Sequence, residues 1–324
     1  MAMGSDIALG LPPRKRAVEQ SSEWRTRDKV GLWLCWAAGI ALCLIAAAIV
    51  IFMAVRGLQY LRPKLLVTHP QPDLDQSKTG GFLDPILGTV ILVLVGIAIA
   101  LPIGVCTAVW LTEYGRPRWL ARAVESGVEI VAGTPSIVLA IFGLLLFQQG
   151  IFGFLSFKAA NGGVFARSFF TSGAMMSLLA LPLVITATRE GLNSIPVHVR
   201  EASYALGKTK AATIRRVLLP AARPGIATGA TLGMGRIAGD TAIVVILLGA
   251  SLQLQAEGGL PLLKTLKGTG STLTSYVYNN SPAGEGNAPQ KAYAAAFVLL
   301  IVVVALNFAV DLIVRNRREP QWIR

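Results

Sequence analysis

The chain has 324 residues, of which 53% are hydrophobic and only 15% are charged. Its mean hydropathy is +0.59, and a soluble protein carries roughly a quarter charged residues, so the composition excludes an ordinary soluble fold. The formal net charge of +13 is best explained by basic loops held near anionic lipid, so we expect the lipid bilayer and no nucleic acid as a partner.

Apolar runs of about 20 residues suit the hydrocarbon core of a bilayer, and the chain contains six of them. We therefore predict an all-α, polytopic membrane protein. Residues 1–31 form a basic tail, 56–82 an external loop, 83–318 one domain with five spans, and 319–324 a short tail. The six predicted spans are Leu32–Val55, Leu83–Leu111, Val124–Phe154, Ser168–Thr188, Gly225–Ala250 and Tyr293–Val314.

Basic residues between the spans predict the orientation of the chain. Twenty Lys and Arg residues fall in the segments that share one side with the N-terminus, and nine fall on the other side. Because cytoplasmic loops carry the excess of Lys and Arg, we expect both termini and the segment 196–220 to be cytoplasmic.

A proline interrupts the third predicted span, in the sequence Gly133-Thr134-Pro135-Ser136. A break inside a span is tolerated where it lines a cavity or packs within protein. The hydroxyls of Thr134 and Ser136 can therefore donate to a passing anion, or they can bond back to their own helix.

The fifth predicted span carries a pair of opposite charges. Arg236 lies about twelve residues past Pro224, which places it roughly 18 Å into the span. Asp240 is one helical turn further on, and Thr241 follows it. The guanidinium can be neutralised by Asp240 or can grip a tetrahedral oxyanion with two parallel N–H groups. The alternative is a purely structural ion pair that ties two helices together.

The cytoplasmic segment 196–220 contains a short motif with regular spacing. Glu201-Ala202-Ser203 is followed after three residues by Gly207, and after nine more by Val217, with Leu219-Pro220 at its end. Pro196 predicts the start of a helix, Glu201 suits its first turn by the helix dipole, and Gly207 suits a C-terminal cap.

This motif resembles the EAA loop of bacterial ABC importer permeases, with Ser203 in place of Ala and Val217 in place of Ile. Arg236-Ile-Ala-Gly-Asp240-Thr241 is similar to the R-x-x-G-E-T sequence of the PstA-type permeases of phosphate ABC importers. Gly133-Thr134-Pro135-Ser136, Leu87-Gly88-Thr89 and Glu113-Tyr114 also fit that family, over about residues 82–318. The family often carries an arginine where this chain has Thr186, and Arg189 could replace it.

The resemblance implies a permease of the MetI-like fold in a bacterial plasma membrane. It would form a phosphate path with a PstC-like second permease, driven by a dimer of PstB-like ATPases and fed by a PstS-like phosphate-binding protein. The path would use Arg236, Asp240, Thr241, Thr134, Ser136 and Arg189. The ATPase would be contacted by Arg200, Glu201, Ala202, Ser203, Gly207, Lys208 and Lys210, with the three cations paired to acidic residues of the ATPase.

No phosphate-binding Walker motif is present, because position 202, where its first glycine would stand ahead of Gly207-Lys208-Thr209, is alanine. We therefore expect no enzymatic activity and no cofactor in this chain, with ATP and Mg used by the partner ATPase. The alternatives are the same architecture importing molybdate, sulfate or another small solute, an ion-coupled secondary transporter, or a membrane anchor that senses phosphate.

Overall fold

The computed structural model describes residues 26–70, 80–157, 163–249, 265–282 and 289–315. Most of the predicted N-terminal tail and all of the predicted tail at 319–324 lie outside these ranges. The chain divides into two units, residues 1–52 and 53–324. The described ranges are helical without a β-strand, which confirms the predicted all-α class.

Helix α1 (Thr26–Leu58) contains the first predicted span and extends it at both ends. Asp28 lies in its first turn and Arg56 in its last turn, where each charge interacts favourably with the helix dipole. After α1, the chain continues into the short helix α2 (Pro63–Val67).

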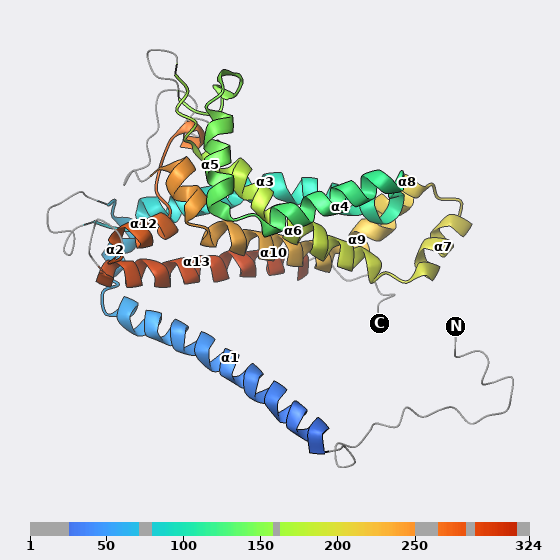
Figure 1. The fold of residues 1–324 in the computed structure, drawn as a ribbon, viewed down its shortest axis with the longest axis horizontal. Helices are drawn as coiled ribbons and strands as arrows, with labels where there is room; N and C mark the ends of the chain where they lie inside the picture. The colour runs from blue at the N-terminus through green and yellow to red at the C-terminus, as the bar shows by residue number, and fades with distance from the viewer. Residues whose placement is uncertain (1–25, 71–79, 158–162, 250–264, 283–288, 316–324) are drawn as a thin grey trace. The chain divides into compact units, whose positions relative to one another are not determined.

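The second unit is built around four helices that lie side by side, namely α3 (Leu83–Val109), α6 (Phe169–Asn193), α10 (Arg223–Gly239) and α13 (Pro289–Arg315) (Figure 1). Helix α10 contacts the other three. Helix α3 continues as a π-helix, η1 (Trp110–Tyr114). The remaining helical segments are α4 (Arg118–Gly133), α5 (Ser136–Phe147), η2 (Gly150–Phe152), α7 (Val197–Ala205), α8 (Lys210–Thr213), η3 (Ile214–Leu218), α9 (Leu219–Ala221), η4 (Val244–Leu248) and α12 (Leu273–Asn280).

Four described helices, α1, α3 with η1, α6 and α13, are long and apolar enough to cross a membrane. A fifth span results if α4 and α5 are taken together, and these two are bent by 107°. Pro135 causes the bend, because it has no N–H to donate and forces Thr134 out of the helical conformation. Thr134 accordingly has an extended ψ of 130°.

The fifth predicted span is not one continuous helix. Helix α10 ends at Gly239, Asp240 has an extended ψ of 126°, and the chain becomes helical again before η4. The Asp240 carboxylate accepts the N–H of Ile243 at 3.0 Å. A short acidic side chain competes in this way with the helical ladder and caps the next turn. The fifth predicted span, Gly225–Ala250, is therefore divided at Asp240 into two helical segments, and Ala250 lies outside the described residues.

Glycines let α6 and α10 approach until their backbones touch. A Cβ atom built on Gly225 would lie 2.7 Å from the Cα of Gly191, and one built on Gly191 would lie 2.9 Å from the Cα of Gly225. Further along, Gly229 faces the backbone of Val184, which is fully buried. The two helices therefore run antiparallel in van der Waals contact, as small residues permit in membrane bundles.

We expect Gly225→Ala to lower the thermal stability of the purified protein, because backbone atoms cannot move aside as a side chain can. Overpacking of this kind costs about 1–3 kcal/mol. Gly235→Ala is the matched control on the same helix, since a Cβ there meets nothing within 4 Å. The control should be neutral or stabilising, because glycine inside a helix costs about 0.5–1 kcal/mol relative to alanine. Equal melting temperatures for the two variants in detergent would contradict this packing.

Candidate functional site

The EAA-like loop forms two short helices that meet at a glycine turn. Helix α7 ends at Ala205, and Gly207 has a φ of +72°, which L-residues rarely adopt. The N–H of Gly207 donates to the Tyr204 carbonyl at 2.9 Å, and the chain then re-enters a helix at Lys210. The predicted C-terminal cap at Gly207 is thus the geometry observed. The segment of α7, the turn and α8, residues 197–213, is called the coupling loop below.

Ser203 stands where the family pattern has a second alanine, and the structure gives its hydroxyl a partner. Its Oγ lies 2.9 Å from Oγ1 of Thr213, and both residues are buried. This hydrogen bond joins α7 to α8 across the Gly207 turn. A buried hydroxyl without a partner would be costly, so the pair explains why serine is accepted at this position.

The outer side of α7 is apolar and uncovered by the described chain. Val197 is 64% exposed, Tyr204 42% and Leu206 77%, and Glu201 and Ala202 are exposed beside them. Glu201 was expected in the first turn, but α7 begins at Val197 and has no acidic residue there. Its carboxylate therefore lies beyond the first turn, where an interaction with the helix dipole would be expected.

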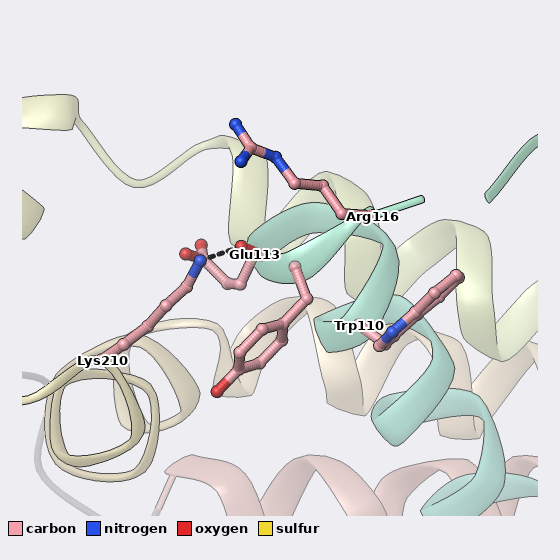
Figure 2. A pocket seen from close by; sticks show the side chains of 5 residues that line it. Trp110, Glu113, Arg116 and Lys210 are labelled. Atoms are coloured by element: carbon pink, nitrogen blue, oxygen red, sulfur yellow. Dashed lines mark hydrogen bonds between the residues drawn. The ribbon is translucent and has the colours of Figure 1, made fainter. Parts of the chain in front are cut away.

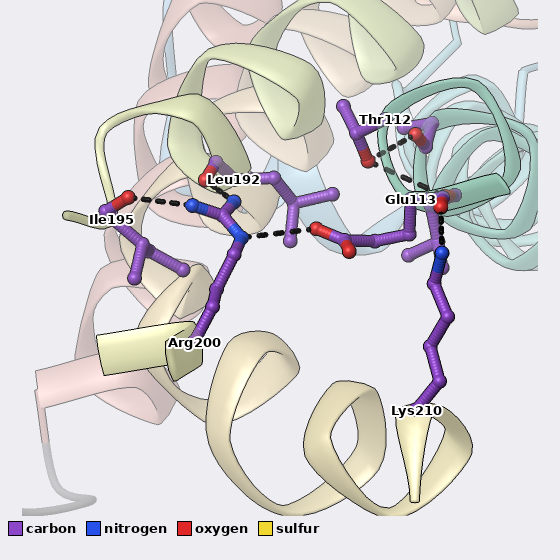
Figure 3. A network of polar contacts seen from close by, with 8 residues as sticks. Thr112, Glu113, Leu192, Ile195, Arg200 and Lys210 are labelled. Carbon is purple, nitrogen blue, oxygen red and sulfur yellow. Dashed lines mark hydrogen bonds and ion pairs between the residues drawn. The ribbon is translucent and has the colours of Figure 1, made fainter. Parts of the chain in front are cut away.

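Two of the three cations expected to ring this loop have partners within the chain. The guanidinium of Arg200 donates to the carbonyls of Leu192 and Ile195, both at 2.8 Å, and to the Glu113 carboxylate at 3.2 Å (Figure 3). The Nζ of Lys210 donates to the main-chain carbonyl of Glu113. In the described ranges, Lys208 alone of the three has no ion pair or side-chain hydrogen bond.

A cavity of about 800 Å³ opens beside this contact, lined by Trp110, Glu113, Tyr114, Arg116 and Lys210 (Figure 2). Lys210 Nζ lies 4.6 Å from the centre of the Tyr114 ring, within cation–π range. In the sequence Glu113-Tyr114 signalled only a family likeness, because its partners lie about 90 residues away along the chain.

Arg236 and Asp240 form a loose ion pair at the break after α10. Their closest N and O atoms, Nη2 and Oδ2, are 3.8 Å apart, and the side chains are 46% and 3% exposed. Charge-assisted hydrogen bonds are usually about 2.7–2.9 Å long, so Arg236 is only weakly held. Asp240 is buried and also bonded to the Ile243 amide. Thr241 follows at the break, and its carbonyl accepts the N–H of Val245.

Of the two hydroxyl groups predicted at the third span, the structure gives a hydrogen bond to that of Thr134 only, among the residues that it describes. Thr134 Oγ1 donates to the Ile130 carbonyl of its own helix at 2.7 Å, so it follows the structural alternative. Ser136 is the first residue of α5 and is partly exposed. Within the described ranges its hydroxyl has no hydrogen-bond partner.

Arg189 lies at a different depth from Arg236. It forms a 2.7 Å ion pair with Glu125 in a cavity of about 430 Å³ that Thr186 also lines. Because Gly191 packs on Gly225, Arg189 is level with the start of α10. Arg236 is eleven residues beyond Gly225, or roughly 16 Å along the helix axis. The structure therefore separates the predicted path residues into two groups.

Comparison with known proteins adds relatives and structural neighbours. Residues 100–318 match the family of binding-protein-dependent transport system inner membrane components. The phosphate transport system permease protein PstA 1 of Mycobacterium tuberculosis is 35% identical over 251 residues, 76% of this chain and 75% of that protein. PstC of Xylella fastidiosa is 29% identical over 251 residues, 72% of each chain.

Two solved ABC transporters share the fold. A chain of the MetNI methionine ABC transporter has a TM-score of 0.52 at 24% identity, covering 73% of this chain and 94% of that one. A chain of a bacterial alginate ABC transporter has a TM-score of 0.55 at 16% identity, covering 89% and 93%. With the family match over residues 100–318, the chain belongs to the inner-membrane components of binding-protein-dependent transport systems.

Proposed function

We propose that this chain is a permease subunit of an ATP-driven importer and that it carries inorganic phosphate across a bacterial plasma membrane. The observation that carries the proposal is the likeness to phosphate transport permeases over three quarters of the chain, at up to 35% identity. The loose Arg236–Asp240 pair, placed at a break in an apolar helix, supports an anion as the substrate.

The partners follow from the same likeness. A second, PstC-like permease would complete the path, a PstB-like ATPase dimer would use ATP and Mg, and a PstS-like protein would deliver phosphate from outside. The excess of Lys and Arg supports a cytoplasmic location for the coupling loop and both termini. The exposed apolar side of α7 and the Gly207 turn suit docking of the ATPase there.

The geometry supports a defined division of labour in the path. Asp240 is buried and anchored by the Ile243 amide, whereas Arg236 is half exposed and 3.8 Å away. The arginine is therefore the mobile partner. Its planar guanidinium can leave Asp240 to hold phosphate with two N–H groups, and Asp240 then recovers it. The anion is released because Asp240 competes for the same guanidinium, and transport requires such weak binding.

We expect Arg236→Gln to reduce phosphate uptake at least about tenfold in proteoliposomes that hold the complete complex. A hydrogen bond to a charged group contributes about 1.5–3 kcal/mol, and 1.4 kcal/mol corresponds to a factor of ten. Arg223→Gln, at the start of the same helix, is the matched control and should retain uptake. Wild-type uptake inhibited by sulfate or molybdate as strongly as by phosphate would assign another oxyanion. Normal uptake by an assembled Arg236→Gln complex would remove the proposed role.

Two changes at Asp240 should separate its charge from its capping of the helix. Asn caps as well as Asp, so Asp240→Asn should keep thermal stability. It removes the carboxylate that competes with phosphate for Arg236, so the apparent affinity for phosphate should rise and turnover should slow. Asp240→Glu keeps the charge but reaches past the Ile243 amide, so stability should fall by about 1 kcal/mol, the usual cost of a lost cap. The measurements are the melting temperature and the KM and maximal rate of uptake. The reverse pattern would mean that Asp240 acts only as a counter-ion.

Gly207→Val should reduce the phosphate imported per ATP hydrolysed, because a left-handed backbone costs an L-residue about 1–2 kcal/mol. A Cβ at this position meets nothing within 4 Å, so the effect is conformational and not steric. Gly207→Asn is the control, since asparagine tolerates this backbone conformation. We expect it to remain mostly coupled. Identical coupling ratios for the two variants would show that the shape of the turn does not matter.

A further inference from the structure

Glu113 is the point where three segments far apart in the sequence meet. Figure 3 shows the Arg200 guanidinium between the Glu113 carboxylate and the carbonyls of Leu192 and Ile195. Leu192 belongs to the last turn of α6, Arg200 to α7, and Glu113 to η1. Arg200 therefore adds donors to two carbonyl groups where α6 ends and also joins this end to η1.

Both sides of the coupling loop reach Glu113. Arg200, on α7, contacts its carboxylate, and Lys210, at the start of α8, contacts its main-chain carbonyl. The Lys210 ammonium also lies over the ring of the adjacent Tyr114. Because these two helices flank the Gly207 turn, one residue of η1 holds the loop on either side of that turn.

The contact is shielded from solvent. The Glu113 side chain is 8% exposed and that of Arg200 is 19% exposed, whereas Arg189 and Glu125 at the same end of α6 are 38% and 36% exposed. Shielding strengthens an ion pair and makes the loss of one partner costly, because the other charge is left buried. The Glu113–Arg200 contact is thus more than a surface ion pair.

Glu113 lies at the end of a continuous helix, α3 with η1, that packs on α10 beside Arg236. Helix η1 continues α3 without interruption, and the Thr112 hydroxyl bonds to the Ala108 carbonyl at 2.8 Å across the junction. Helix α3 packs against both α6 and α10. In particular, a Cβ on Gly96 of α3 would lie 2.8 Å from the side chain of Ile237, the residue after Arg236. A displacement of α3 would therefore displace Ile237, next to Arg236.

We propose that Glu113 is a positioning residue for energy coupling, which transmits movement of the coupling loop through η1 and α3 to the helix that carries Arg236. The covalent route from the loop to α10 runs through η3 and α9. The Glu113 contact adds a second, non-covalent route, so the loop moves α3 and α10 together. The inference deepens the proposed function, because it assumes that an ATPase drives the coupling loop.

The test uses the complete complex in proteoliposomes with Glu113→Gln, Arg200→Lys and the double variant. Glutamine keeps the shape of Glu113 without its charge, and lysine keeps the charge of Arg200 without its planar fork. We expect each single change to lower the phosphate imported per ATP hydrolysed by about tenfold, within the usual range of coupling between sites. The double variant should be no worse than either, because the two residues act as one unit.

Glu190→Gln is the matched control. Glu190 lies near the same end of α6 and is exposed, and its side chain has no ion pair or hydrogen bond within the described ranges. It should couple like the wild type. Unchanged coupling in Glu113→Gln would overturn the proposal, and so would a drop in ATP hydrolysis and uptake by the same factor, since that indicates only loss of assembled complex.

A distance measurement tests the contact without reference to the substrate. Spin labels at positions 116 and 208, in a background without the native cysteines Cys35, Cys43 and Cys106, report the separation of η1 from the coupling loop. Glu113→Gln should broaden or lengthen this distance, and Glu190→Gln should not. An unchanged distribution would refute the Glu113 contact even if the importer carried another anion. Absence of wild-type phosphate uptake would instead refute the proposed function.

Discussion

The requirement that backbone groups in an apolar surrounding find hydrogen-bond partners shapes the two most informative places in this chain. Wherever a span is broken or ends, amide or carbonyl groups lose their helical partners. Asp240 supplies an acceptor to the amide of Ile243 after the break in the fifth span. Arg200 supplies donors to the carbonyls of Leu192 and Ile195 at the end of α6. In both places the charged side chain that completes the helix also contacts a second charge.

This double use links helix geometry to the movements of an importer. Asp240 cannot follow Arg236 without giving up the amide that it caps, so in the proposed mechanism the pair opens by movement of the arginine. Arg200 belongs to the coupling loop and is bonded both to Glu113 and to the end of α6, so movement of the loop would act on both. In the proposed mechanism Asp240 stays on the amide that it caps while Arg236 moves, whereas Arg200 and Glu113 move together.

Several features could be read from residue order because they depend on local physics. The membrane class follows from composition, and the turn at Gly207 follows from the preference of glycine for a positive φ. The bend near Thr134 follows from Pro135. The break at Asp240 does not follow from residue order, because an apolar run rich in glycine is compatible with one helix or with two. Two helices form because the carboxylate of Asp240 accepts the N–H of Ile243 and so caps the second one.

Residue order alone predicts the membrane-embedded helical fold, the family and the residues that carry charge into the spans, since these depend on composition and spacing. Which charges meet depends instead on how the helices pack. The fold brings Arg200 and Lys210 to Glu113, about 90 residues away, and it places Arg236 roughly 16 Å beyond Gly225 along α10, away from the end of α6 that carries Arg189. The reason is physical: contacts between distant segments depend on how closely helices pack, and here the Gly191–Gly225 contact sets the register of α6 against α10.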